Sequence, residues 1–147
     1  MAGKYCTIIQ ANSTTMKAHT QTTFVPQFFV GKNGADAVEF YKKAFDAIEL
    51  RRFSNDDGTV HVSELEIGGA LFHIHEEKPS ARRYSPTLCG GTTTIMGLMV
   101  ADPDAVIERA VAAGATVLSP MQDYDYGYRQ GDIRDPFGHQ WMIEKII

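Results

Sequence analysis

The segment Asp36–Leu50 reads DAVEFYKKAFDAIEL, and the segment Asp104–Leu118 reads DAVIERAVAAGATVL. Offset by 68 positions, the two segments are identical at Asp36, Ala37, Val38, Ala44, Ala47 and Leu50 of the first. A strand-like run precedes each segment, Thr23–Val30 in one case and Thr94–Val100 in the other. A repeat whose neighbouring elements also match predicts a chain built from two copies of one supersecondary unit.

Both repeated segments carry the signals of an amphipathic helix. In the second, Asp102 is suited to the N-cap, and Pro103 fits the first helical position, where its missing N–H is not needed. Gly114 is suited to end this helix in a left-handed conformation. In the first copy Asn33 is the expected N-cap, and Tyr41 belongs to the face expected to be buried.

Three strands are expected after each helix, because the following runs are rich in β-formers and separated by turn sequences. Their expected ranges are Ile48–Ser54, Thr59–Ile67 and Ala70–His75 in the first copy, and Thr116–Gln122, Tyr128–Arg134 and Gln140–Ile146 in the second. Each half therefore reads βαβββ, and the fold class is α+β with two tandem βαβββ modules. We expect a flexible segment over residues 1–22, then a single domain over 23–147 made of module one (23–77), a linker (78–92) and module two (93–147).

Composition limits the function classes. The chain has 147 residues, 44% of them hydrophobic and 22% charged, which favours a folded domain with its own core. A net charge of −4 with scattered Lys and Arg gives no nucleic-acid footprint. No run reaches the roughly 20 apolar residues of a membrane span, and no secretory signal is visible. Cys6 and Cys89 have no metal-ligand spacing, so a cytoplasmic protein with free thiols is expected.

Several stretches resemble one known family. They are AVEFYKKAFDA (Ala37–Ala47), GTVHVSELEIGGALF (Gly58–Phe72) and, most specifically, YGYRQGDIRDPFGHQW (Tyr126–Trp141). Together with the paired βαβββ pattern, they make the chain similar to the vicinal oxygen chelate superfamily, in its glyoxalase/bleomycin-resistance group and the PhnB-like branch. The resemblance implies two curved sheets around a cavity. In metal-dependent members the first and last strands of each module supply His, Glu or Gln ligands to a divalent ion that polarises the substrate.

Transferred residue by residue, the ligand positions fall at Val25 or Pro26, at His73, at Ile95 or Met96, and at Met142. Of these only His73 is a plausible ligand for a divalent cation. The resemblance therefore predicts no complete metal site, with His73 and Glu144 as the remaining candidates and Zn, Ni or Fe as the candidate ions.

The strand period of two extends the candidate site. If His73 faces the cavity, then Leu71 and His75 do so as well, while Phe72 and Ile74 face the helix. By the same rule Gln27 and Phe29 share one face, as do Gln140, Met142 and Glu144. These alternations let His73, His75, Gln27 and Glu144 converge.

Other candidates each have a structural alternative. Arg129 fits either an anionic ligand or an ion pair with Asp132 or Glu66. Tyr124, Tyr126 and Tyr128 share a face that suits a pocket or a dimer seam. His61 suits packing or ligand contact, His139 a turn, and Trp141 the core or the cavity wall. The predicted cavity residues are Gln27, Phe29, His61, His73, His75, Tyr126, Tyr128, Arg129, Trp141, Met142 and Glu144.

Three function classes follow. The first is a small-molecule binding protein of the glyoxalase/bleomycin-resistance type that lacks the full ancestral metal site. The second is a metal-dependent lyase, isomerase or dioxygenase with a rearranged site around His73, and the third is an interaction module. The sequence leaves open whether the chain is an enzyme, and the resemblance predicts a homodimer.

Overall fold

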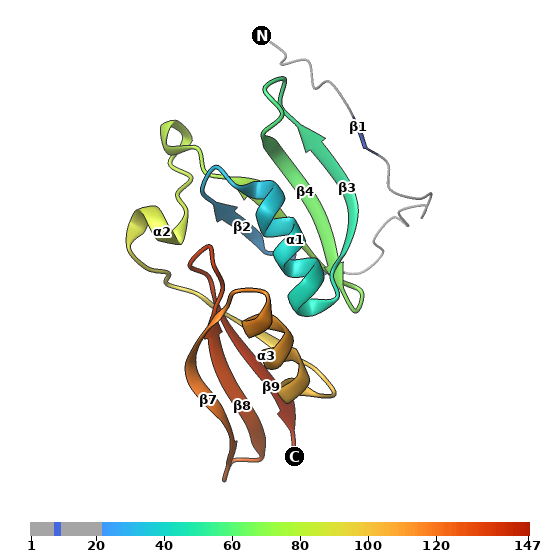
Figure 1. The fold of residues 1–147 in the computed structure, drawn as a ribbon, viewed down its shortest axis with the longest axis vertical. Helices are drawn as coiled ribbons and strands as arrows, with labels where there is room; N and C mark the ends of the chain where they lie inside the picture. The colour runs from blue at the N-terminus through green and yellow to red at the C-terminus, as the bar shows by residue number, and fades with distance from the viewer. Residues whose placement is uncertain (1–7, 10–21) are drawn as a thin grey trace.

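The two halves of the chain fold into the same arrangement of strands around one helix each (Figure 1). The computed structural model describes residues 8–9 and 22–147. The elements in chain order are β1 Ile8–Ile9, β2 Gln27–Val30, α1 Gly34–Phe45, β3 Ile48–Ser54, β4 Val60–Ile67, β5 Ala70–Glu76, the 3-10 helix η1 Pro79–Ala81, α2 Pro86–Cys89, β6 Ile95–Met99, α3 Pro103–Ala112, β7 Thr116–Tyr124, β8 Tyr128–Arg134 and β9 Gln140–Ile146. The predicted α+β class with two tandem βαβββ modules is confirmed.

Both sheets have the same topology. The first has the order β1-β3-β4-β5-β2 and the second the order β6-β9-β8-β7. In each module the opening strand pairs in parallel with the last one, β2 with β5 and β6 with β9, while the other neighbours within the module are antiparallel. The helix that follows the opening strand makes this parallel return possible, because a parallel pair needs a long crossover connection.

The sequence signals set the helix ends only in part. As predicted, the Asp102 side chain caps α3 by accepting a hydrogen bond from Ala105 N at 3.2 Å. Asn33 is the N-cap residue of α1 as predicted, but its side chain makes no cap hydrogen bond. Its place is taken by Glu76 on β5, whose Oε1 accepts from Gly34 N at 3.1 Å. A carboxylate at this end also suits the positive pole of the helix.

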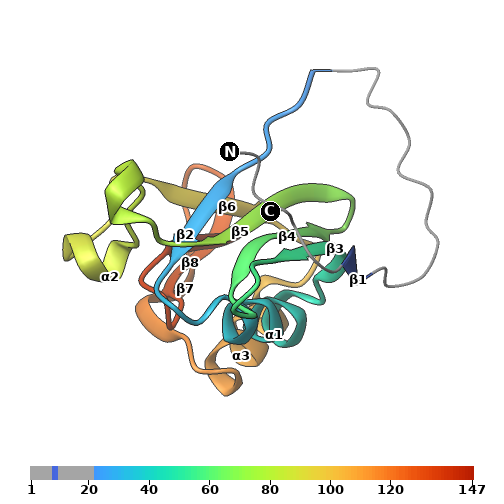
Figure 2. The same ribbon diagram turned by 90° about the horizontal axis from the view of Figure 1, so that it is seen from above.

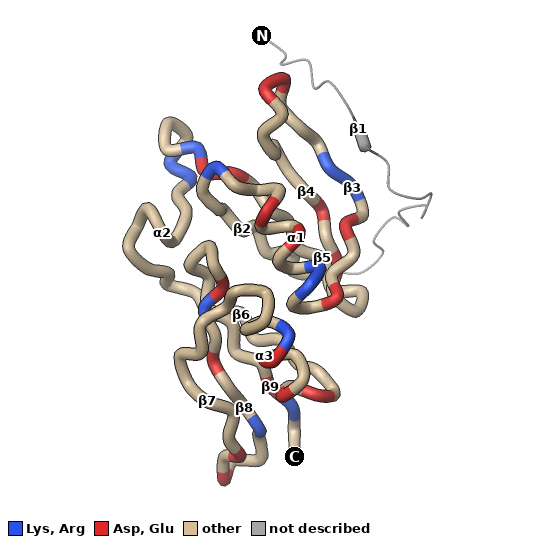
Figure 3. Tube along the Cα trace, viewed as in Figure 1, with Lys and Arg blue, Asp and Glu red and all other residues tan. Residues whose placement is uncertain are grey.

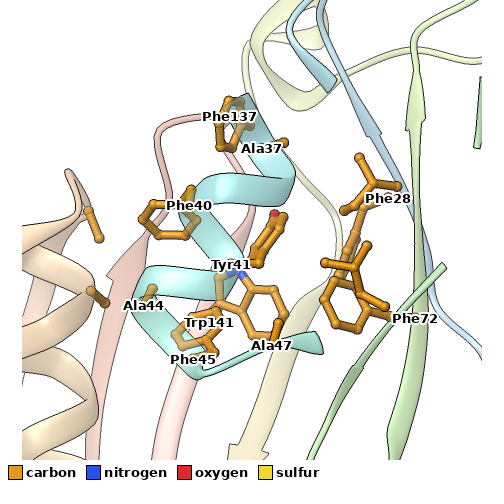
Figure 4. Packing of buried hydrophobic residues seen from close by; sticks show 14 of the residues in the cluster. Phe28, Ala37, Phe40, Tyr41, Ala44, Phe45, Ala47, Phe72, Phe137 and Trp141 are labelled. Atoms are coloured by element: carbon orange, nitrogen blue, oxygen red, sulfur yellow. The ribbon is translucent and has the colours of Figure 1, made fainter. Parts of the chain in front are cut away.

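Helices α1 and α3 lie side by side on one side of the molecule, and the strands of both sheets lie on the other (Figures 1 and 2). The core runs between them and belongs to both modules. Phe45 of α1 lies with its ring centroid 4.7 Å from Trp141 of β9, and Phe40 lies 6.0 Å from Phe137 (Figure 4). Burial of each such large side chain contributes about 1.5–3 kcal/mol, so the two modules share much of their stability.

A buried carboxylate fixes the modules to each other. Asp135, in the turn between β8 and β9, accepts from Tyr41 Oη at 2.6 Å and from Trp141 Nε1 at 3.0 Å through Oδ2. Its Oδ1 accepts from the backbone N–H groups of Phe137 at 2.9 Å and His139 at 3.0 Å. Burial, followed by the charge of Asp135 and the hydrogen bond to it, raises the pKa of Tyr41 well above its usual value.

The outer parts of the predicted layout have mixed outcomes. Most of the predicted flexible segment over residues 1–22 lies outside the described residues; the structure describes only Ile8–Ile9 of it, which pair with β3, and Thr22. The predicted linker 78–92 contains η1 and α2, and Ser85 caps α2 by accepting from Leu88 N at 3.2 Å. The module boundaries stay predictions.

Candidate functional site

Each sheet has one face covered by helix and one face free of it, and the polar residues of interest lie on the free face of the first sheet. Phe28, Phe72 and Ile74 are buried on the helix side. The period of two then places Gln27 and His73 on the opposite, open face, as the alternation in the sequence predicts.

One row of side chains crosses this open face from β3 to β2. Arg51 is the register partner of Glu64, Glu64 is that of His73, and His73 is that of Gln27. Arg51 holds Glu64 through two hydrogen bonds, from Nε at 3.0 Å and from Nη2 at 2.7 Å. This planar two-point contact neutralises the buried carboxylate beside His73.

The Gln27 amide bridges the two histidines. Its Nε2 lies 3.1 Å from the Val25 carbonyl oxygen and 3.1 Å from Nδ1 of His73, while its Oε1 lies 2.7 Å from Nε2 of His75. Nδ1 of His75 in turn lies 3.1 Å from the carbonyl oxygen of His61. The sequence predicts the shared face of these residues, and the structure adds the hydrogen bonds that order them.

Burial is the main influence on both imidazoles. It lowers the pKa of His73, against a smaller raising effect of Glu64. It also lowers the pKa of His75, and the positive charges of His73, Arg83 and His61 lower it further, against the raising hydrogen bond to the His61 carbonyl. Burial therefore favours the neutral form of both rings.

An apolar platform adjoins the histidines. The Phe29 ring stacks on the His75 ring with centroids 5.1 Å apart and an interplanar angle of 24°. The Arg83 guanidinium, from the linker, lies 5.8 Å from the centroid of Phe29. Gln27 and Phe29 also line a cavity of about 510 Å³ that extends towards the second module, where Gln140 lines it; the two histidines lie outside its lining. This size suits a small organic molecule.

The second module presents a different open face. Ile95 and Gln140 are paired in the second sheet at the position where Gln27 and His73 are paired in the first. On the same face, the next pair of the second sheet is Gly97 and Met142, which corresponds to Phe29 and His75. Those rows therefore carry no imidazole or carboxylate.

Of the four residues predicted to converge, Gln27, His73 and His75 lie together, and Glu144 does not. Glu144 lies on β9 in the other sheet, where Gln130 donates a hydrogen bond to it. The donors at the ancestral ligand positions do not fit a divalent cation, since Ile95 and Met142 offer an alkyl group and a weak thioether. Among residues 8–9 and 22–147, no group of three or more His, Cys, Asp and Glu is arranged to hold a metal ion.

Arg129 lies on the helix side of the second sheet. It donates to Asp104 of α3 at 2.8 and 2.6 Å and to Asp123 at 2.7 Å. The predicted ion pair of Arg129 with Asp132 or Glu66 is therefore wrong. Asp132 is three positions away on the same strand and so points to the other face. These ion pairs leave Arg129 committed to structure rather than to the open face.

The remaining candidates are spread over the molecule. Tyr126 stacks on Tyr124 with centroids 5.0 Å apart and lies 6.0 Å from Tyr128, at the far end of the second sheet. Trp141 belongs to the core and also borders an apolar hollow of about 180 Å³. His61 lies on β4, with its carbonyl oxygen facing His75.

His139 has a role beyond the predicted turn. Its ring is buried, lies 4.7 Å from the Phe28 ring, and places Nε2 3.0 Å from the Phe29 carbonyl oxygen. Burial lowers the pKa of His139. It therefore ties the second module to the strand that carries the open-face residues. No sequence pattern signals this contact, because its partners are 110 positions apart.

Comparisons with known proteins agree with the fold. The model of the Glyoxalase/Bleomycin resistance protein/Dioxygenase superfamily matches residues 19–143. The protein Rv0887c of Mycobacterium tuberculosis is 36% identical over 141 residues, which cover 94% of this chain and 82% of the relative. Among solved structures, the At5g48480 product of Arabidopsis thaliana is 30% identical with a TM-score of 0.67 and covers 87% of this chain and 100% of its own.

Two further solved structures are similar. TioX from Micromonospora sp. ML1 is 27% identical with a TM-score of 0.64, over 86% of this chain and 97% of its own. The fosfomycin resistance protein FosX of Listeria monocytogenes, at 16% identity and a TM-score of 0.64 over 88% of this chain and 96% of its own, shares the fold alone. The chain belongs to the Glyoxalase/Bleomycin resistance protein/Dioxygenase superfamily. Within the described residues, no helix is long and apolar enough to cross a membrane.

Proposed function

We propose that this member of the superfamily binds a small organic molecule on the open face of β2–β5 and does so without the ancestral metal site. The observation that carries the proposal is the contrast between the two modules. The first offers Gln27, His73 and His75 beside an aromatic ring, whereas the second has Ile95, Gln140 and Met142 at the matching ladder positions, with no imidazole among them. A ligand can use one polar face, whereas the metal site that the family resemblance implies draws its donors from both modules.

The PhnB-like assignment and the homodimer are part of the same proposal. The stretch Tyr126–Trp141 supports the assignment. Exposed apolar side chains on the second sheet, Ile95 at 51% and Met99 at 53%, support self-association.

Metal analysis tests the proposal directly. Protein purified without chelator should carry much less than one equivalent of Zn, Ni or Fe per chain, and stoichiometric metal would remove the proposal. In a screen of small molecules by thermal shift, hits should stabilise the wild type and lose their effect in His73→Ala. The exposed α1 variant Lys43→Ala is the matched control, since it lies on the helix side and should keep every hit.

A metal-dependent lyase with a rearranged site around His73 is the second candidate. One observation favours it: His73 and His75 lie on one face with ring centroids 6.3 Å apart. It requires that His73→Ala abolish both metal content and turnover. Unchanged metal occupancy in that variant would rule it out.

A further inference from the structure

The hydrogen bonds around Gln27 determine where the protons of the two imidazoles lie. Val25 presents a carbonyl oxygen 3.1 Å from one end of the amide, so that end is the NH₂ group. Its second hydrogen points to Nδ1 of His73 at 3.1 Å, which must therefore be an acceptor. In the neutral ring the proton then lies on Nε2 of His73.

The other end of the amide acts in the opposite sense. Oε1 of Gln27 can only accept, so Nε2 of His75 at 2.7 Å carries a proton. Within residues 22–147, Nε2 of His73 has no hydrogen-bond partner and is not among the buried unsatisfied atoms. The atom that His73 presents to the open face is thus an N–H donor, not the lone pair of a base or a metal ligand.

The charges around this donor favour an anion. Glu64, the nearest carboxylate, is neutralised by Arg51. Arg83 makes no ion pair within the described residues and lies over the Phe29 ring. It belongs to the loop between β5 and α2, in which Figure 3 shows blue Lys and Arg beside the acidic end of β5, and the Glu77 carboxylate of this loop accepts hydrogen bonds from Ser85. Glu66, the other acidic residue of β4 on this face, lies two register pairs further along, opposite Leu71.

His75 adds a second reason. Both of its ring nitrogens face oxygens, at 2.7 and 3.1 Å, so the neutral ring that burial favours can donate to only one of them, whereas an imidazolium would donate to both. The groups that oppose this charge are His73 on the same strand, His61 on β4 and Arg83 in the linker. A bound anion would offset that repulsion.

We infer that Gln27 sets the ligand class of this site: a small organic oxyanion, such as an aromatic carboxylate, whose oxygen accepts from Nε2 of His73 while its apolar part lies on Phe29. The inference rests on the proposed binding function and names its ligand class. Gln27 is the positioning residue and His73 the contact residue.

Benzoate and its neutral isostere benzamide are suitable probes. In ¹⁵N spectra of the ring nitrogens, assigned with His73→Gln and His75→Gln, ligand-free wild type should show the Nε2–H tautomer at His73. Benzoate should perturb His73 and bind at least about tenfold more tightly than benzamide, because a hydrogen bond to a charged acceptor contributes about 1.5–3 kcal/mol. An Nδ1–H tautomer at His73, or equal binding of benzamide, would overturn the inference.

The variant Gln27→Glu tests the role of the amide. A carboxylate accepts from both rings, so His73 should change to the Nδ1–H tautomer and turn a lone pair towards the ligand. Benzoate binding should then weaken at least about tenfold, with unchanged far-UV circular dichroism, since Gln27 is exposed. An unchanged tautomer or unchanged benzoate affinity would contradict the inference. Absence of benzoate binding to wild type would also overturn it, whereas the proposed function fails separately, on stoichiometric metal.

Discussion

Replacement of Asp135 by Asn should sharply reduce the stability of the fold. The carboxylate accepts four hydrogen bonds inside the core, two at each oxygen. An amide keeps one acceptor oxygen and turns an NH₂ group towards the other two donors. Each buried donor left without an acceptor costs about 1–3 kcal/mol, so the free energy of unfolding should fall by about 2–6 kcal/mol. Total stabilities are only about 5–15 kcal/mol.

Urea unfolding measures this change. Trp141 is the only tryptophan of the chain and donates to Asp135, so its fluorescence follows the network, while far-UV circular dichroism follows the backbone. Tyr41→Phe removes one donor and should cost about 1.5–3 kcal/mol. Because both changes act on one network, the double variant should lose at least about 0.5 kcal/mol less than the sum of the single losses.

The exposed variant Lys43→Ala is the control and should lie within about 0.5 kcal/mol of wild type. If Asp135→Asn unfolds at the same urea concentration as that control, the turn does not hold the modules together as the hydrogen bonds indicate. The same conclusion would follow if the two single losses were strictly additive.

Three further predictions concern pH and packing. Because the pKa of Tyr41 is raised in the fold, its neutral hydroxyl stabilises the fold below pH of about 10. The free energy of unfolding should fall above that pH, and less steeply in Tyr41→Phe than in wild type. Equal alkaline unfolding curves for the two proteins would contradict this. Because burial lowers the pKa of His139, the neutral ring contributes its full stabilisation of the fold above pH of about 6.5. The free energy of unfolding should fall as the pH drops below that value. In urea titrations at acid pH, His139→Gln should show a smaller fall than wild type. Gly131→Ala would place a Cβ 2.8 Å from Ile107 and should cost about 1–3 kcal/mol, whereas Gly97→Ala, with only the flexible Glu144 side chain at 3.3 Å, should cost less; the reverse order in thermal unfolding would refute the packing argument.

Elements and strand faces could be predicted because they depend on neighbours in sequence. Alternation along β5 separates His73 and His75 from Phe72 and Ile74, and the structure confirms that separation. The same alternation contained a signal that was missed for Arg129. Tyr128 and Arg129 are adjacent on one strand, so they cannot both face the same cavity.

The links between modules could not be predicted in this way. Asp135 and Tyr41 are 94 positions apart, and nothing local to either residue indicates the other. The missing side-chain hydrogen bond of the N-cap Asn33 has the same origin, because the carboxylate that accepts from Gly34 N belongs to Glu76, 42 positions away. Tertiary contacts therefore decide both the cap and the attachment of the modules.

The repeat explains how one face can change its chemistry without loss of the fold. The contacts that join the modules lie on the helix sides, where Trp141 and Tyr41 both donate to Asp135. Donor residues on the second open face can therefore be lost, as Ile95 and Met142 indicate, while the first keeps Gln27 and its two histidines. Under the proposed function, a site kept on one module alone holds its ligand by hydrogen bonds and ring contact rather than by an ion shared between the modules.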